Sequence, residues 1–489
     1  MGRENLETVV LQAHMDMVCE KRPDSLHDFS KDPIQLRFWK KDGISMVSAV
    51  DTTLGADNGI GVAYALVAAC ATSRPALEIL LTSDEEEGLT GAQNLSDDFV
   101  SGKYLLNLDS EEEGILIAGC AGGVSLSFKK SFDPCFMENS ASSPFSYYSV
   151  RIFGLLGGHS GTDIDKPRAN ANVLLGNLLR SILEKINKTN DINKTDINAT
   201  ISTFPTKGSE LELRLVNING GSVHNAIPRE AACTFMTDLP LDFLNEMIQE
   251  FQSVLEKTIR SSEPNLKFSF DKMERNEINK AANEKANILE SNPVQIPVFN
   301  SKNTARIISL ISSIPHGVFE MSDKIPGLVL TSGNLAVMRS EFFEPEKSKE
   351  NTKDKKLEFK ITYSLRSGNE FKLKEKSKEF IDIGENHDFH VSVFGSYKPW
   401  EPDFDSGWIS LCKKVYKHHF LKEIQVSAIH AGLECGVLGR KYPSLQMVSL
   451  GPDISNAHTP DETMNLDSAK RVWVYIQTIL ENFDVKKQD

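Results

Sequence analysis

The chain has 489 residues, of which 40% are hydrophobic and 25% charged, and its formal net charge at pH 7 is −14. A chain of this length exceeds one ordinary hydrophobic core, so we expect two large folding units. The acidic balance argues against nucleic acid and anionic membrane as partners, because no strongly basic patch is visible.

The seven cysteines are widely spaced and include no Cys-x-x-Cys pair. This pattern is typical of reduced thiols in the cytosol rather than of a disulfide framework or a thiolate metal site. No window holds the roughly 18 consecutive apolar residues of a membrane span, and the polar, acidic start is no secretory signal. We therefore predict a cytoplasmic location.

Up to about residue 123 the sequence alternates between strand-like and helix-like segments. Residues 9–13, 77–82 and 104–108 are short apolar runs of the buried-strand type, and residues 59–72 form an Ala-rich helical segment. Such alternation predicts an α/β unit with a mainly parallel sheet covered by helices.

After residue 123 the strand candidates alternate polar and apolar residues, which is typical of an antiparallel sheet with one solvated face. These candidates are residues 124–130, 147–153, 211–216, 231–237, 357–365 and 389–394, and the helical candidates are residues 172–187 and 241–261. We predict that residues 124–396 form an α+β substrate or lid domain. It would be inserted into a catalytic domain made of residues 1–123 and 397–489.

The second part of the catalytic domain is predicted to contain a helix at 407–420, a strand at 445–450 and a closing helix at 466–483. We detect no internal repeat. Three polar stretches look like surface excursions, at residues 188–198, 275–291 and 344–356. The first and third are predicted to be mobile loops, because dense charge and few apolar residues do not offset the entropy of ordering.

Acidic and imidazole side chains follow several of the predicted strands. In open α/β sheets ligands gather outside the carboxyl ends of the strands, so residues far apart in the chain can converge there. The residues concerned are His14, Asp16, Glu85, Glu86, Asp109 and His458. Asp57 lies among small residues just ahead of the helical segment, where a carboxylate can approach two cations. Together these residues suit a two-metal hydrolase site.

Each residue also has a simpler interpretation when taken alone. Asp57 is a plausible helix N-cap, and Glu85 and Glu86 belong to an acidic run in which Asp84 and Glu87 compete for the same roles. A lone histidine on a Gly-rich turn, such as His159, is more often structural than catalytic. The combination is therefore far more specific than any single motif.

Six motifs resemble, in order, those of the aminoacyl-histidine dipeptidases. They are residues 14–16, 55–59, 82–88, 107–114, 157–161 and 456–462. These enzymes are also called Xaa-His or carnosine-type dipeptidases, and they belong to the co-catalytic zinc aminoacylase/carboxypeptidase superfamily. The resemblance spans nearly the whole chain and implies a cytosolic metallopeptidase that hydrolyses dipeptides.

The resemblance implies a metal-binding role for five residues. His14 and Asp109 would complete the site of the first zinc ion, and Glu86 and His458 the site of the second. Asp57 would bridge both ions, with a cis peptide bond after it. Manganese or cobalt are alternatives to zinc, because all three accept such nitrogen and oxygen ligands.

The resemblance also implies how the remaining residues act. Asp16 would orient the first histidine ligand, and Glu85 would be the general base for a water whose pKa the metals lower. His159 would hydrogen-bond the oxyanion, and a homodimer in which it reaches across the subunit interface is compatible with this role. Asn225 would contact the substrate, and Arg229 would pair with its terminal carboxylate.

One departure from the family concerns the start of the chain. The family normally has several dozen residues before its first metal-ligand strand, whereas here residues 9–13 already form it. The resemblance thus implies a shortened catalytic domain, which we interpret as a truncated gene model.

Two other functions compete with the dipeptidase. An N-acyl amino acid hydrolase or a tripeptidase would use the same scaffold, and a panel of substrates would separate these activities. A non-catalytic homologue that only binds metal or a partner is the rival from another class. The presence of all the metal-motif residues argues against lost chemistry.

Overall fold

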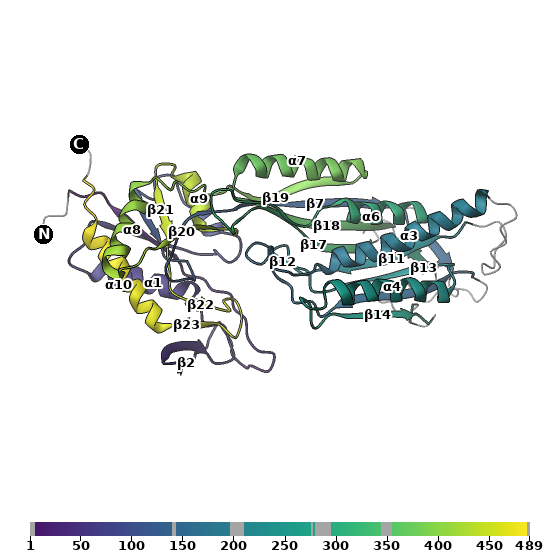
Figure 1. The fold of residues 1–489 in the computed structure, drawn as a ribbon, viewed down its shortest axis with the longest axis horizontal. Coiled ribbons are helices and arrows are strands. Elements are labelled where there is room, and N and C mark those ends of the chain that lie inside the picture. Colours follow the sequence, from purple (N-terminus) through teal and green to yellow (C-terminus); the bar gives the residue numbers. More distant parts are fainter. Residues whose placement is uncertain are drawn as a thin grey trace.

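The computed structural model describes residues 5–138, 143–195, 210–274, 277–278, 295–343 and 355–486. The molecule is elongated and has two lobes, with both ends of the chain in the same lobe (Figure 1). Among the described residues, no helix is long and apolar enough to cross a membrane.

The first lobe is built on a six-stranded sheet. Its order is β20 (Gln425–Ile429), β6 (Ile115–Cys120), β21 (Gln446–Ser449), β5 (Tyr104–Asn107), β1 (Val9–His14) and β4 (Leu77–Thr82). The strands pair in parallel except β21 with β6. The prediction of a mainly parallel sheet is therefore confirmed. β1 is buried along its whole length, which explains why all but two of its six residues are apolar.

Helices cover both faces of this sheet. One face packs against α1 (Ala56–Cys70), α8 (Gly407–Phe420) and α10 (Leu466–Asn482), and the other against α2 (Thr90–Asn94) and α9 (Glu434–Lys441). The predicted helix at 407–420 is confirmed, and the closing helix ends one residue earlier than predicted. The short helices α2 and α9 lacked a clear periodic pattern and were not predicted.

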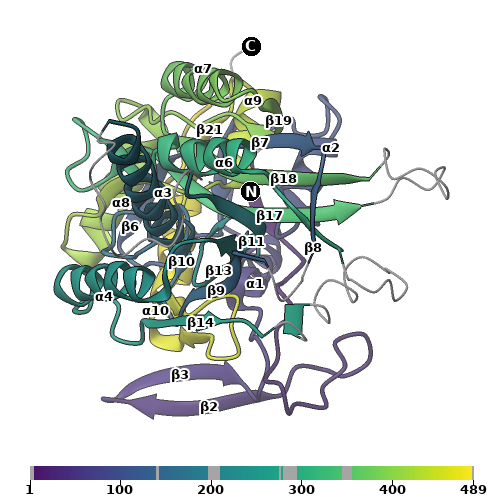
Figure 2. The same cartoon turned by 90° about the vertical axis from the view of Figure 1, so that its right-hand side faces the viewer.

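A small antiparallel sheet at the side of this lobe was also not predicted. Its order is β2 (Leu36–Lys41), β3 (Ile44–Ala49), β23 (Thr463–Asn465) and β22 (Ile454–Ser455). The β2–β3 hairpin projects from the body of the molecule (Figure 2). Its turn residues Asp42 and Gly43 both have positive φ, at 51° and 84°, and an Asp-Gly pair favours this kind of turn.

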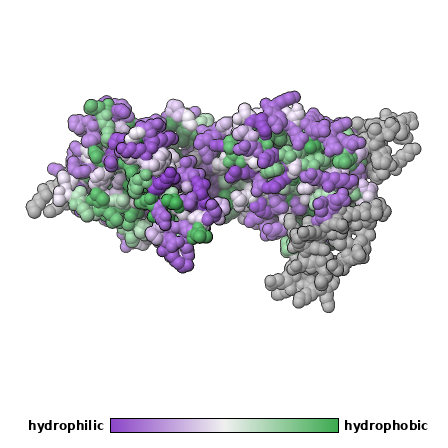
Figure 3. Space-filling model, turned by 90° about the horizontal axis from the view of Figure 1, so that it is seen from below, coloured by the Kyte–Doolittle hydropathy of each residue, from purple (hydrophilic) through white to green (hydrophobic). Residues whose placement is uncertain are grey.

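Seen from below, hydrophobic residues gather on the surface of the first lobe among mostly hydrophilic ones (Figure 3). Exposed apolar side chains of α1 and β2, such as Leu66 and Phe38, are 54% and 66% exposed.

The second lobe contains a nine-stranded sheet in which every pairing is antiparallel. Its order is β14 (Lys267–Lys272), β9 (Ser146–Phe153), β13 (Ala231–Thr237), β11 (Leu213–Gly220), β17 (Val329–Phe343), β18 (Lys356–Ser367), β7 (Gly122–Phe132) and β19 (His390–Tyr397), with β16 (Gly317–Met321) beside β17. The predicted antiparallel sheet is confirmed.

Four helices complete the core of this lobe: α3 (Ala171–Thr195), α4 (Leu241–Thr258), α6 (Ser301–Ser313) and α7 (Glu370–Asn386). Two further strand pairs lie outside the large sheet. They are β8 (Cys135–Glu138) with β15 (Gln295–Val298), and β10 (Gly158–His159) with β12 (Ala226–Ile227).

The second lobe has an internal structural repeat, which was not detected in the sequence. One unit runs β9-α3-β11-β13-α4-β14 and the other β7-α6-β17-β18-α7-β19. Both have the strand order 4-1-3-2, and they meet through β11 and β17. The first unit is inserted between the first strand and first helix of the second, which hides the repeat in the sequence.

The predicted excursions have mixed outcomes. The mobile loop expected at residues 188–198 is wrong up to Thr195, because α3 continues to that residue; residues 196–198 lie outside the described residues. Of the stretch 275–291 only residues 277–278 are described, and of 344–356 only the last two. β7 begins at Gly122 and β19 ends at Tyr397, and we propose domain boundaries at about residues 123 and 397.

Burial of aromatic rings in the first lobe gives a test of this fold. Phe483 is fully buried, with its ring centroid 5.2 Å from that of Tyr104 and 5.7 Å from that of Trp408. Phe483→Ala should lower the free energy of unfolding by about 3–5 kcal/mol. Phe99→Ala, at a residue that is 60% exposed, should change it by about 0.5 kcal/mol or less. If urea unfolding showed that both variants lose the same free energy of unfolding, this packing would be contradicted.

Candidate metal centre

The predicted site residues come from the carboxyl ends of three neighbouring strands. His14 is the last residue of β1, Glu85 and Glu86 follow β4, and Asp109 follows β5. Because β1 pairs in parallel with both β4 and β5, these ends lie at one edge of the sheet. Asp57 joins them from the N-terminal end of α1.

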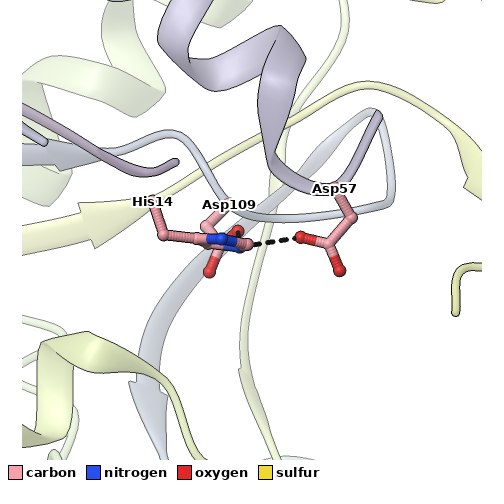
Figure 4. A group of neighbouring side chains, drawn as sticks. All are labelled: His14, Asp57 and Asp109. Carbon is pink, nitrogen blue, oxygen red and sulfur yellow. Dashed lines mark hydrogen bonds and ion pairs between the residues drawn. The ribbon is translucent and has the colours of Figure 1, made fainter. Parts of the chain in front are cut away.

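His14, Asp57 and Asp109 form the first cluster (Figure 4). The Nε2 atom of His14 lies 2.9 Å from Oδ1 of Asp57 and 3.1 Å from Oδ1 of Asp109. The imidazole is 1% exposed. One ring nitrogen thus faces two carboxylate oxygens, whereas a neutral imidazole offers at most one hydrogen there.

The second cluster uses the other oxygen of the same carboxylate. The Nε2 atom of His458 lies 3.0 Å from Oδ2 of Asp57 and 3.1 Å from Oε1 of Glu86. Asp57 therefore stands between the two histidines, with one oxygen directed to each. The Asp57–Asn58 peptide bond is cis, as the resemblance implies.

The charges of these clusters call for added cations. Burial lowers the pKa of His14, but its hydrogen bonds with Asp109 and Asp57 outweigh this and raise it to about 12. Hydrogen bonds with Asp57 and Glu86 raise the pKa of His458 to about 11. In both places the surrounding carboxylates stabilise positive charge at the ring nitrogen.

The donor set also fits divalent metal ions. Ligand atoms of His14, Asp57 and Asp109 lie within 4.8 Å of one another, as do those of Asp57, Glu86 and His458. Two atoms bound tetrahedrally at about 2.0–2.1 Å from zinc would lie roughly 3.3 Å apart, close to the separations observed. Mixed imidazole and carboxylate donors suit zinc, manganese and cobalt alike.

Glu85 lies beside both clusters. Its ligand atom lies within 4.8 Å of those of His14 and Glu86. Burial, and then the charge of Asp109, raises the pKa of the Glu85 carboxyl to about 9. Without metal ions this carboxyl therefore holds a proton at neutral pH, and the charge of added cations would favour its release, which leaves a carboxylate that can accept a proton.

Asp16 contacts one residue of each cluster, His14 and Glu86. The Nδ1 atom of His14 lies 3.0 Å from the backbone carbonyl oxygen of Asp16 and 3.6 Å from its carboxylate. The carboxylate instead accepts a hydrogen bond from the backbone N–H of Glu86 at 3.1 Å. The backbone of Asp16 thus makes the contact with the ring that we expected of its side chain.

Glu462 was not predicted, although it lies within the last of the six motifs. Its buried carboxylate accepts hydrogen bonds from the backbone N–H groups of Leu54, Gly55 and Ala56 at 2.7, 3.0 and 2.8 Å. These bonds hold the segment that presents Asp57. A negative charge at the start of α1 is also favourable to the helix dipole.

A buried polar network behind the clusters was likewise missed. Glu434, at the start of α9, accepts hydrogen bonds from Gln12 and from the Thr82 hydroxyl. Asn58 donates to the Asp109 carboxylate at 2.6 Å and to the backbone carbonyl of Leu108 at 2.8 Å. Gln12 and Thr82 lie within the predicted strands at residues 9–13 and 77–82. Only their polar side chains, among apolar neighbours, indicated a role beyond the core.

The clusters open into a cavity of about 1740 Å³ between the two lobes. From the first lobe it is lined by Asp57, Glu85, Glu86, Asp109 and His458, and from the second lobe by His159, His224, Asn225, Arg366 and Tyr397. The structure thus brings His159 and Asn225 to the same cavity as the clusters of their own chain.

His159 faces this cavity as a neutral side chain. Burial, and then the charge of Arg366, lowers the pKa of His159 to about 4. Its Nδ1 atom accepts a hydrogen bond from the backbone N–H of Thr162 at 3.2 Å. The ring hydrogen is therefore on Nε2, which leaves that nitrogen as a donor.

Arg229 does not line the cavity, so the structure does not support its predicted contact with the substrate. Its Nε donates to the backbone carbonyl of Leu155 at 3.2 Å, and the residue is exposed. Arg366 of β18 lines the cavity instead and is only 8% exposed. Arg366 lies in a strand outside the six motifs, so the sequence around it gave no reason to expect a functional role.

Comparisons with known proteins agree with this geometry. The sequence pattern of the group described as "Peptidase family M20/M25/M40" matches residues 10–482. The chain is 33% identical to the cytosol non-specific dipeptidase of Escherichia coli (strain K12), over 99% of this chain and 87% of that protein. The crystal structure of the aminoacylhistidine dipeptidase from Vibrio alginolyticus superposes with a TM-score of 0.71 and 32% identity, over 100% of this chain and 86% of that one.

The hydrogen bonds of Glu462 give a test of the site. Glu462→Ala should weaken metal binding roughly 10- to 100-fold, as loss of a group that supports a metal ligand typically does. Its neighbour Asp461, whose side chain is 68% exposed, provides the matched control. We expect Asp461→Ala to retain the metal content of the unmodified protein after dialysis. Unchanged metal affinity in Glu462→Ala would contradict the supporting role.

Proposed function

The chain belongs to peptidase family M20/M25/M40, and on that basis we propose that it hydrolyses dipeptides, with Xaa-His dipeptides as its preferred substrates. The observation that carries this proposal is the Asp57 carboxylate, whose two oxygens lie 2.9 and 3.0 Å from the Nε2 atoms of His14 and His458. We also propose the cytoplasm as its location, since the Escherichia coli relative is described as cytosolic.

We propose that two divalent cations, zinc by preference, occupy the two clusters. His14 and Asp109 would hold one, Glu86 and His458 the other, and Asp57 both. When bound, the cations supply Lewis acidity, which lowers the pKa of water and polarises a carbonyl group. Their charge would also replace the protons that the two histidines otherwise hold.

Glu85 would move the proton in this reaction. Its carboxylate would accept a proton from the attacking water and return it to the nitrogen of the leaving amine. Burial raises the pKa of Glu85, and the charge of the two cations would offset this, so that the carboxylate is ionised and able to accept the proton. The neighbouring Glu86 would remain a metal ligand. The two adjacent carboxylates would thus have different roles, proton transfer and metal binding.

His159 and Asn225 would contact the substrate from the second lobe. The Nε2–H of neutral His159 is a suitable donor to the oxyanion that develops on the scissile carbonyl. Asn225 lines the cavity beside it and offers both a donor and an acceptor to the peptide. Closure of the two lobes around the dipeptide would also exclude water from the site.

Arg366 would bind the C-terminal carboxylate, the role we first expected of Arg229. Its guanidinium group is largely buried yet borders the cavity, and a planar guanidinium matches a carboxylate. A carboxylate held at a fixed place near the clusters would favour short substrates. This supports a dipeptidase over an enzyme of longer peptides.

Replacement of the proposed base separates chemistry from metal binding. Glu85→Gln should reduce turnover by a factor of at least roughly 100, which is the lower end for loss of an acid–base group. The metal content should stay at the level of the unmodified protein, because glutamine keeps the shape of the side chain. Full activity of this variant would refute the assignment of Glu85.

A substrate panel tests the proposed specificity. Purified protein supplied with zinc should cleave Xaa-His dipeptides faster than tripeptides or N-acyl amino acids, and a chelator should abolish the activity. Readdition of zinc, manganese or cobalt would show which cation restores it best. Preferential cleavage of N-acyl amino acids or tripeptides would favour the rival hydrolases, and metal binding without any cleavage would favour the non-catalytic homologue.

A further inference from the structure

Tyr397 is a cavity residue that none of the motifs contains. It is the last residue of β19 and pairs with Gly123 of β7, where the chain passes between the two lobes. Its side chain lines the same cavity as Glu85 and His159. It has no role in the mechanism proposed above.

Two glycines fix the position of the Tyr397 ring. A Cβ atom on Gly123 would lie 2.7 Å from the Cε1, Cζ and Oη atoms of Tyr397, and one on Gly432 would lie 2.9 Å from Oη. Real side chains do not approach so closely, so only glycine leaves room for the phenol on both sides. A ring confined in this way loses little conformational freedom when it binds a ligand.

The hydroxyl of Tyr397 is hydrogen-bonded to the buried guanidinium group of Arg366. Nη1 of Arg366 donates a hydrogen bond to Oη of Tyr397 at 2.7 Å. An oxygen that accepts this bond keeps its own O–H for another partner. Burial raises the pKa of the Tyr397 phenol, so the group stays protonated and remains a donor.

Arg366 can donate further hydrogen bonds. Its side chain is 8% exposed, and its buried Nε atom has no hydrogen-bond partner among the described residues. A buried guanidinium needs an anion to offset the loss of hydration. In a dipeptide the C-terminal carboxylate is the negative group that is always present.

We propose that Tyr397 is a substrate-binding residue whose hydroxyl donates a hydrogen bond to the same C-terminal carboxylate that Arg366 binds. This inference rests on the proposed dipeptidase function and adds a second, rigid donor to it. Because both donors are held in fixed positions, the carboxylate would have one allowed place in the cavity. The pair would thus select peptides in which a single residue follows the scissile bond.

The test compares a dipeptide with the same dipeptide lacking its negative charge. For Ala-His, Tyr397→Phe should lower kcat/KM roughly 10- to 100-fold through a higher KM, as expected for a hydrogen bond to a charged group. For the C-terminal amide of Ala-His the variant should behave like the unmodified protein. Tyr416→Phe, which removes a hydroxyl of α8 outside the cavity, should affect neither substrate.

Binding without turnover gives an independent readout. In Glu85→Gln, calorimetry with Ala-His should show a Kd that rises by the same factor when Tyr397→Phe is added. If Tyr397→Phe fails to fold, the acid and amide substrates are compared on Tyr397→Met, which also lacks the hydroxyl and should likewise lose activity only on the acid.

Two results would overturn the proposal. Equal losses on the acid and the amide would place the hydroxyl at the scissile carbonyl, and no loss on either would remove it from the substrate altogether. Failure of the unmodified protein to cleave any dipeptide is a different outcome, because it refutes the proposed function whatever Tyr397 does.

Discussion

The carboxylate of Asp57, placed between the imidazoles of His14 and His458, is the interaction around which the rest of the structure is organised. It joins a histidine at the end of β1 to one that lies 444 residues later in the sequence numbering, in the loop before β23. A bridging anion between two cation-binding places allows both charges to lie close together. The buried carboxylates around it are otherwise costly, which explains why the site needs metal.

The surrounding fold serves this arrangement. Parallel pairing of β1 with β4 and β5 brings three sets of ligands to one sheet edge, and Glu462 holds the turn before Asp57 by its backbone N–H groups. The repeated second lobe then supplies His159, Asn225, Arg366 and Tyr397 to the opposite wall of the cavity. In our proposal the first lobe provides the metal ligands and the second lobe the substrate-binding groups.

Much of this arrangement could be predicted from the sequence, for a definite physical reason. Strands such as β1 and β4 have mostly apolar sequences, and polar residues directly after them are easily recognised. Arg366, Tyr397 and Glu434 gave no such signal, because their importance arises from contacts between distant segments. The internal repeat and the continuation of α3 beyond residue 188 were not predicted for similar reasons: one unit interrupts the other, and Asn190 of α3 is held by hydrogen bonds with the backbone of Leu211.

The most direct test of the central claim is a crystal structure of the zinc-loaded protein with anomalous scattering recorded at the zinc edge. Our account predicts two peaks, one on each side of the Asp57 carboxylate, the first beside His14 and Asp109 and the second beside His458 and Glu86. A single peak, or peaks elsewhere in the molecule with this carboxylate bound to neither, would contradict it.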